Sequence, residues 1–254
     1  MVGWYYSITA VWGPRPETPA QVADQWLRGM DAISQLGPRF ARWKVKDTAN
    51  QQFLSLRAAR AQMARIVEGA VLKDDWGKPA PDEGYRVQAF TTQGGDDLEP
   101  DDFDFLSKLG SEWKNYVWLN MGFIGRPGDL SAIRYPEMKA LISVIAANWK
   151  APWVNAGISC ADITPLDVAS NDLFFASPNG WERRPYGRPW VSYLSAERTV
   201  GLRIPSVLTS ERTPDGGLLL SAVTEQFDPE NTDQLALSSL LSEIMAERGG
   251  NPGL

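Results

Sequence analysis

The sequence has 254 residues, with 25 basic residues, 31 acidic residues and no histidine, which gives a formal net charge of −6. Without histidine, the chain lacks the side chain most often used as a general base near neutral pH and the commonest metal ligand. Its single cysteine, Cys160, excludes an internal disulfide, and a zinc site would consist almost wholly of carboxylates, which suit that metal poorly. A hard ion such as magnesium or calcium is the metal that such ligands would hold.

A predicted strand and a predicted helix open the chain, joined by the loop WGPRPET, Trp12 to Thr18. Residues Trp4 to Trp12 are aromatic and β-branched, which is typical of a buried strand, and the glycine and prolines of the loop end it. Thr18 is a good N-cap and Pro19 suits the first helical position, so a helix is expected from there to Leu36. The loop is therefore interpreted as a strand stop and helix start without a catalytic group.

The middle of the chain predicts alternating helices and strands. Helices are expected at Asn50 to Ala70 and Pro136 to Ala147 from the spacing of apolar residues, and strands at Tyr85 to Thr91 and Tyr116 to Phe123. The intervening sequence WGKPAPDEG predicts a loop. The most apolar region, Ala140 to Ala161, is interrupted by polar residues and a proline, so no membrane-spanning segment is expected.

The last third predicts a strand from Trp153, a hairpin around the turn TPDGG and a final helix. A short helix after Thr164 would repeat the strand-to-helix order of the opening segment. Asp228 is expected to cap the last helix and Pro229 to open it. These elements predict an α+β fold with a mixed or antiparallel sheet and packed helices, as one domain over residues 1–254, or as two similar strand-helix halves that meet near residue 150.

Two short motifs resemble catalytic or phosphate-binding sequences but lack an essential part. The sequence GISCA, Gly157 to Ala161, resembles a nucleophile elbow, but it lacks the final glycine and no histidine is present to accept the serine proton. The sequence GFIGRPG, Gly122 to Gly128, has a glycine spacing that matches neither the dinucleotide fingerprint nor the phosphate loop. We interpret the first as the end of a strand and the second as a loop.

The sequence GWERRPYGRPW mixes arginines with aromatic residues. Such a mixture could stack on and neutralise single-stranded nucleic acid, and it is equally the composition of a protein-interface hot spot. Because the chain is acidic overall, a protein interface or plain packing is favoured over nucleic acid. The residues concerned are Arg183, Arg184, Arg188, Trp181, Tyr186 and Trp190.

One acidic segment carries the whole net charge. The nine residues DDLEPDDFD contain six acidic residues and no cation, and the rest of the chain has 25 acidic and 25 basic residues. A concentrated negative field attracts cationic partners and repels nucleic acid, so a partner-binding role is predicted for this segment, with a solvated loop or the start of a helix as the alternative. The acidic residues are Asp96, Asp97, Glu99, Asp101, Asp102 and Asp104.

Segments near the two ends of the chain together resemble one family. The sequence YYSITAVWGPRPETPAQVADQWL, followed by GPRFARW, resembles the opening of the immunity protein 52 family of bacterial polymorphic toxin systems. The sequence GGLLLSAVTEQFDPENTDQLALSSLLSEI is similar to that family's last strand and helix. The likeness is weak between about Val71 and Pro152, and it transfers no toxin-contacting residue to this chain.

The resemblance implies a protein that binds and neutralises a nuclease toxin with a restriction-endonuclease-like domain, such as a type VI secretion effector. It implies an α+β fold, a cytosolic location, no catalytic residue and no cofactor, and we expect no metal site. The first thirteen residues lack the cationic start and long apolar core of a secretory signal, so a cytosolic location is expected.

A hydrolase is the alternative function. Carboxylates of the acidic segment could hold magnesium or calcium for a carboxylate-dependent hydrolysis. Against a helix-loop-helix calcium site, Pro100 stands where a flexible loop is needed and the required glycine is missing. This alternative rests on the acidic segment alone.

Overall fold

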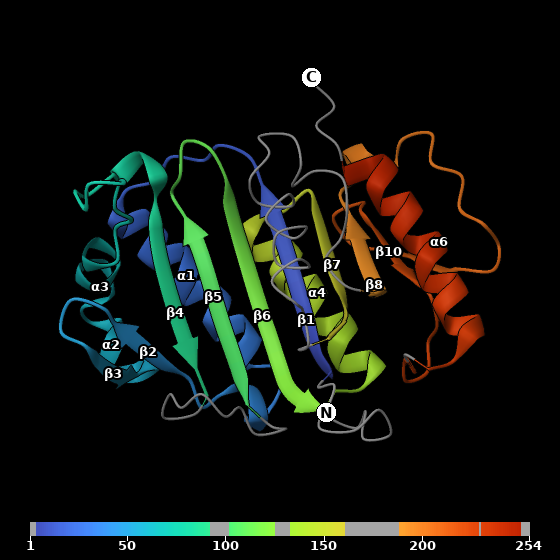
Figure 1. Ribbon diagram of the computed structural model, residues 1–254, viewed down its shortest axis with the longest axis horizontal. Helices are drawn as coiled ribbons and strands as arrows, with labels where there is room; N and C mark the ends of the chain where they lie inside the picture. The colour runs from blue at the N-terminus through green and yellow to red at the C-terminus, as the bar shows by residue number, and fades with distance from the viewer. Residues whose placement is uncertain (1–3, 92–101, 125–132, 161–187, 229, 250–254) are drawn as a thin grey trace.

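A ten-stranded antiparallel sheet forms the centre of the molecule in the computed structural model (Figure 1). The structure describes residues 4–91, 102–124, 133–160, 188–228 and 230–249. The strand order is β3-β2-β4-β5-β6-β1-β7-β8-β10-β9, so strands from both sides of residue 150 belong to one sheet. The predicted α+β class with an antiparallel sheet and packed helices is confirmed.

The strands are β1 (Trp4–Trp12), β2 (Lys44–Asp47), β3 (Gln52–Ser55), β4 (Tyr85–Phe90), β5 (Phe103–Leu109), β6 (Asn115–Ile124), β7 (Trp153–Cys160), β8 (Arg188–Leu194), β9 (Thr209–Arg212) and β10 (Leu218–Ser221). The α-helices are α1 (Pro19–Ser34), α2 (Leu56–Arg60), α3 (Met63–Gly69), α4 (Tyr135–Trp149) and α6 (Thr232–Gly249), and short 3-10 helices are η1 (Pro38–Phe40), η2 (Pro81–Glu83) and η5 (Ala196–Thr199). Among the described residues, no helix combines the length and the apolar character needed to cross a bilayer.

Strand β1 occupies the middle of the sheet, between β6 and β7. Ile8, for example, pairs with Leu119 on one side and with Ala156 on the other. Alternate β1 residues such as Tyr6, Ile8 and Ala10 are fully buried. The predicted buried strand at Trp4 to Trp12 is therefore confirmed, and it joins two parts of the chain that are distant in sequence.

The loop after β1 ends the strand and starts α1, as predicted, and it also contacts α4. Thr18 Oγ1 accepts a hydrogen bond from the Gln21 backbone N–H, and Gln21 Oε1 accepts one from the Thr18 N–H, which forms a capping box. Arg15 Nη1 donates to the Trp149 carbonyl at 2.7 Å, and the Arg15 guanidinium lies 5.0 Å from the centre of the Trp12 ring. A cation at this carbonyl is favoured because Trp149 ends α4, where carbonyls lack helical partners.

The two faces of the sheet differ in what covers them. Helices α1 and α4 lie behind the strands in Figure 1, on the face that we call the helical face, and α6 lies in front, on the opposite face. The larger apolar cluster fills the helical face, and includes Trp26 of α1 and Phe105 of β5, whose rings are 6.1 Å apart. The smaller cluster joins α6 to β8 and β10 through Leu241, Leu194 and Leu220. Alternation along each strand therefore separates two apolar clusters.

The predicted helix over Asn50 to Ala70 is wrong in its first part, because residues Gln52 to Ser55 form β3 and only α2 and α3 are helical. Buried Asp47 fixes the turn before β3: its carboxylate accepts hydrogen bonds from the Asn50 side chain at 2.8 Å and from Arg65 at 2.6 Å. The chain then turns back and pairs with β2. This side-chain network is not visible in the apolar periodicity from which the helix was predicted.

The predicted start of the last helix is also wrong. Helix α6 begins at Thr232, and the side-chain oxygen of Asn231 accepts hydrogen bonds from the Asp233 and Gln234 backbone N–H groups. Asp228 instead accepts one from the Glu230 N–H, in a turn before the helix. The TPDGG hairpin is confirmed as the β9–β10 turn. The helix predicted after Thr164 and the position of Pro229 lie outside the described residues.

Helices α1 and α4 pack closely at Gly29. A Cβ atom at this position would overlap the Trp149 ring and would lie 2.6 Å from the Asn148 side-chain nitrogen. The same contact is closed by hydrogen bonds between the Gln25 side chain and the Asn148 carbonyl at 3.3 Å, and between the Asn148 side chain and the Gln25 carbonyl at 3.2 Å. The absence of a side chain at Gly29 is thus required by the helix contact.

Gly29→Ala should lower the free energy of unfolding by about 1–3 kcal/mol, because the added methyl forces the helices apart. Alanine is intrinsically favoured over glycine in a helix by about 1 kcal/mol, so packing and propensity predict opposite signs. Gly13→Ala is the control, since a Cβ at Gly13 meets nothing within 4 Å. Urea unfolding would contradict the packing argument if Gly29→Ala were as stable as the wild type or more so.

Candidate functional site

The opposite face of the sheet carries polar and charged side chains over β4, β5 and β6. The register places Arg86 of β4 beside Lys108 of β5, and Lys108 beside Tyr116 of β6. One row further along, Leu106 pairs with Trp118. These residues alternate with the buried apolar residues of the helical face, so their side chains point away from the larger cluster.

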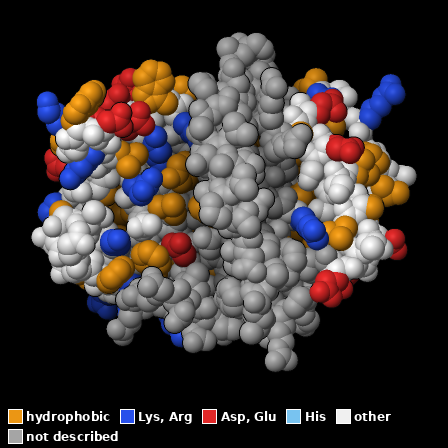
Figure 2. Space-filling view, in the orientation of Figure 1, with side chains coloured by type: hydrophobic (Ala, Val, Ile, Leu, Met, Phe, Trp, Pro, Cys, Tyr) orange, Lys and Arg blue, Asp and Glu red, His pale blue; other side chains and the backbone are white. Residues whose placement is uncertain are grey.

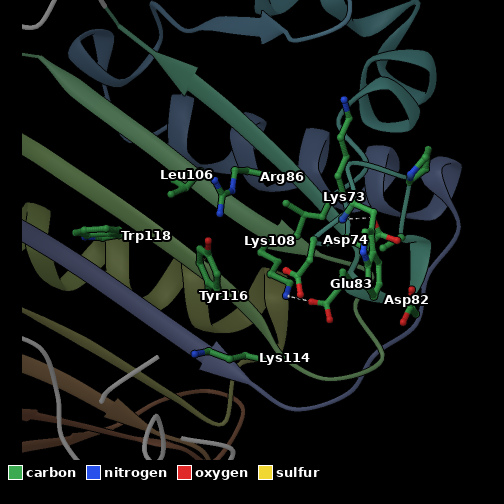
Figure 3. Close-up of a pocket in the computed structure, with 15 residues that line it drawn as sticks. Lys73, Asp74, Asp82, Glu83, Arg86, Leu106, Lys108, Lys114, Tyr116 and Trp118 are labelled. Carbon is green, nitrogen blue, oxygen red and sulfur yellow. Dashed lines mark hydrogen bonds and ion pairs between the residues drawn. The ribbon is translucent and has the colours of Figure 1, made fainter. Parts of the chain in front are cut away.

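A groove of about 960 Å³ lies over these strands, and we call it the β4–β6 groove. Its floor comes from β4, β5, β6 and the β5–β6 turn, and its wall from the segment between α3 and β4 (Figure 3). Figure 2 shows basic, acidic and hydrophobic side chains close together on this side of the molecule. The floor residues are Arg86, Leu106, Lys108, Lys114, Tyr116 and Trp118, and the wall residues are Leu72, Lys73, Asp74, Asp75, Trp76, Pro79, Ala80, Asp82 and Glu83.

The wall is an ordered turn held against the sheet. Asp74 Oδ1 accepts hydrogen bonds from the backbone N–H groups of Trp76 at 2.9 Å and Lys78 at 2.8 Å, and Gly77 has a φ of 78° that favours glycine. The Leu72 N–H donates to the Gly84 carbonyl at 2.9 Å, which ties the wall to the start of β4. The turn leaves the Trp76 side chain 81% exposed at the rim of the groove.

The β5–β6 turn forms the other end of the floor. The Asn115 side-chain oxygen accepts a hydrogen bond from the Ser111 N–H at 2.9 Å, and the Asn115 side-chain nitrogen donates to the Gly13 carbonyl at 2.8 Å. The Glu112 N–H donates to the Asp82 carbonyl at 2.8 Å, which fastens the turn to the wall. This frame places Lys114 in the groove and leaves Trp113 61% exposed on the same turn.

Cations on the floor lie close enough to influence one another. Lys108 Nζ lies 2.9 Å from Glu83 Oε2, in an ion pair between floor and wall. Burial, and then the neighbouring charge of Lys108, lower the pKa of the Lys114 amine to about 8. The groove therefore combines basic side chains on its floor with acidic side chains along its wall.

The structure places two residues of the predicted acidic segment, and the other four, Asp96, Asp97, Glu99 and Asp101, lie outside the described residues. Asp102 is 8% exposed and directly precedes β5. Asp104 is half-buried on the opposite face of the sheet, beside Asn120 of β6. These two carboxylates therefore contribute little to a solvated acidic surface.

Asp104 lies in an environment that disfavours its charge. Burial raises the pKa of the carboxyl group to about 6, and a hydrogen bond from Asn120 offsets part of the shift. Asp104 Oδ1 and Asn120 Oδ1 are both buried, and neither has a hydrogen-bond partner within the described ranges. An ionised Asp104 therefore costs stability in this position.

The other sequence motifs take structural positions where they are described. Trp190 is fully buried, its ring centroid is 5.7 Å from that of Tyr6, and its Nε1 donates to the Val223 carbonyl at 3.1 Å. Ser159 is a strand residue of β7 whose backbone pairs with Tyr5 of β1, whereas a nucleophile elbow requires a sharp turn at the serine. A Cβ at Gly157 would overlap the Arg188 carbonyl, which explains the glycine there by a close strand approach. Trp181, Arg183, Arg184 and Tyr186 lie outside the described residues.

The groove is not predicted by the sequence. The segment WGKPAPDEG predicts only a loop, and the patterns at Tyr85 to Thr91 and Tyr116 to Phe123 predict strands without indicating a site on them. The available signal was a tryptophan in a turn among aspartates, glycine and prolines, where it has no apolar neighbour in sequence to pack with. The floor could not be inferred, because its residues meet only through the pairing of β4, β5 and β6.

Comparison of the chain with known proteins identifies no family for it. Neither a protein-family model nor a characterised protein gives a match to the chain. Within the described ranges, no group of three or more acidic or cysteine residues is placed to hold a metal ion. The resemblance to the immunity protein 52 family stays a prediction.

Asp104→Asn should raise the free energy of unfolding at pH 8 by about 1–3 kcal/mol. The carboxyl group binds its proton more tightly in the folded chain than in the unfolded one, where the pKa is about 3.9, so its contribution to stability is lost as the pH rises from about 4 to about 6. The gain from the substitution should therefore vanish near pH 4. Urea unfolding at both pH values tests this, with exposed Asp24→Asn as the control; an equal gain at the two pH values would contradict the assignment.

Proposed function

We propose that this chain is an immunity protein, which binds a nuclease toxin in the cytosol of the producing cell and neutralises it by forming a complex. The resemblance of its end segments to the immunity protein 52 family implies this role, and the toxin would carry a restriction-endonuclease-like domain and be exported by a type VI system. The β4–β6 groove is the structural feature that supports a protein partner.

The observation that carries the proposal is the exposure of Trp76 at the rim of the groove. A tryptophan that is 81% exposed contributes little to folding, and tryptophan, tyrosine and arginine are enriched in the residues that contribute most to protein interfaces. Tyr116, Trp118 and Arg86 line the same groove. Large aromatic surfaces beside charged groups fit a polypeptide partner, because rings can be buried while polar groups form the rim.

The acidic segment supports the same proposal by its charge. A nuclease that handles phosphates presents a cationic surface, and concentrated opposite charge accelerates association and favours the correct partner. Because Asp102 is buried and Asp104 is half-buried, the proposed contact rests on Asp96, Asp97, Glu99 and Asp101. Blockage of the toxin's active site, stabilisation of an inactive conformation and prevention of toxin assembly are all compatible with this contact.

Trp76→Ala should weaken binding to the proposed toxin partner, which would be encoded by the adjacent gene, by about tenfold or more. The reason is that an interface tryptophan typically contributes more than about 1.4 kcal/mol to binding. Isothermal titration calorimetry measures the affinity, and a nuclease assay measures the residual toxin activity at equal concentrations. Val200→Ala is the control, since Val200 is 75% exposed but belongs to the η5 end of the molecule. If Trp76→Ala bound as tightly as Val200→Ala, the groove would not be the contact surface; if the wild-type chain did not bind the toxin, the proposed function would be wrong.

Reversal of the four acidic residues outside the described ranges, as D96K, D97K, E99K and D101K together, should slow association with the toxin by about tenfold at low salt. The dissociation rate should change less, since steering by charge acts mainly on the encounter. Stopped-flow measurements at low and high salt separate the two rates. Asp102 and Asp104 stay unchanged, so that a folding defect does not imitate the effect. An association rate that equals the wild-type rate at low salt would rule out the acidic segment as a steering surface.

A further inference from the structure

We propose that the floor of the β4–β6 groove is a carboxylate-binding site, in which Arg86, Lys108 and Lys114 receive an aspartate or glutamate side chain of a partner polypeptide. We call these three residues the floor cations. The proposal rests on the proposed function for the identity of the partner, but the site itself depends only on the geometry of the groove. The floor would thus bind an anionic group of the partner, whereas the acidic segment would bind a cationic surface.

The pairing of like charges is the first argument. Arg86 and Lys108 stand directly opposite each other on neighbouring strands, and like charges in this position destabilise a sheet. Glu83 pairs with Lys108, but among the described residues none forms an ion pair with Arg86. An unfavourable arrangement of this kind on a sheet surface is typical of a functional site, because a bound anion would compensate it.

The position of Arg86 is the second argument. Figure 3 shows Arg86 and Tyr116 extending toward each other in the groove, while Lys108 points toward Glu83 and Lys114 lies further along the floor. Arginine offers a planar fork of donors that matches the two oxygens of a carboxylate, and the lysines add charge. Burial, and then the neighbouring charge of Lys108, lower the pKa of Lys114, so an anion placed beside these two lysines would be stabilised by both of their charges.

The charge of the wall identifies the ligand as a polypeptide side chain. Asp74, Asp75 and Asp82 stand along the wall within the same groove, where they would repel the successive phosphates of a nucleic acid. A peptide segment can place one carboxylate on the floor and its own lysine or arginine against the wall. The groove of about 960 Å³ can hold several side chains, and Trp76 can cover them from the rim.

Titration of the full chain with N-acetylglutamate amide tests the site without the toxin. With lysine labelled in ¹³C, the Cε signals of Lys108 and Lys114 should shift and saturate, and the pKa of Lys114 should rise because an anion favours the charged amine. N-acetylglutamine amide, which has the same shape without the charge, should cause no such shift. Inorganic phosphate, the competing source of negative charge, should bind more weakly than the glutamate probe.

Arg86→Gln should weaken binding of N-acetylglutamate amide by about fivefold or more. Arg57 is an exposed arginine on α2, and Arg57→Gln should leave that affinity unchanged. Circular dichroism verifies that both variants are folded. Equal shifts with the glutamate and glutamine probes, tighter binding of phosphate, or equal losses in the two variants would each overturn the proposal. A failed toxin complex with an intact glutamate site would overturn the immunity role alone, and the reverse result would overturn the floor site alone.

Discussion

The structure depends on the alternation of side chains along antiparallel strands. One set of alternate residues builds an apolar layer across the sheet, in which Phe105 lies 5.5 Å from the ring of Trp149 and Tyr6 lies 5.7 Å from that of Trp190. The other set forms the smaller apolar cluster, in which α6 packs against β8 and β10, and carries polar and charged side chains over β4 to β6. The charged groove over β4 to β6 can therefore exist without weakening the larger core, because the two kinds of residue are separated by the pleat of the sheet.

Local sequence signals predicted the elements whose formation depends on neighbouring residues. Thr18 and Pro19 correctly predict the start of α1, and the TPDGG turn correctly predicts the β9–β10 hairpin. The same signals failed where a distant side chain decides the outcome, as at the turn before β3, where Arg65 reaches back to Asp47. The groove could not be predicted for the same reason, since strand register is a property of the whole sheet and is not written in any one segment.

Charge in the sequence and charge on the surface are different quantities here. The acidic segment was identified by counting, but its last member enters β5, where the period of two turns Asp104 toward Asn120. The basic residues of the floor, by contrast, are far apart in the sequence and become neighbours only when β4, β5 and β6 pair. The acidic segment indicates a cationic partner from its composition alone. A site for an anionic group of that partner, by contrast, can be inferred only from the folded β4–β6 groove.

The central place of β1 has a consequence for the order in which the protein is made. Trp4 to Trp12 is synthesised before both of its neighbours in the sheet, which end only at Ile124 and Cys160. At about 5–20 residues per second, this aromatic strand waits on the order of 10 s for its second partner. Until its partner strand is made, each edge of β1 can pair with other chains, so the yield of folded protein should depend on the rate of translation and on whether a chaperone binds the strand in the meantime.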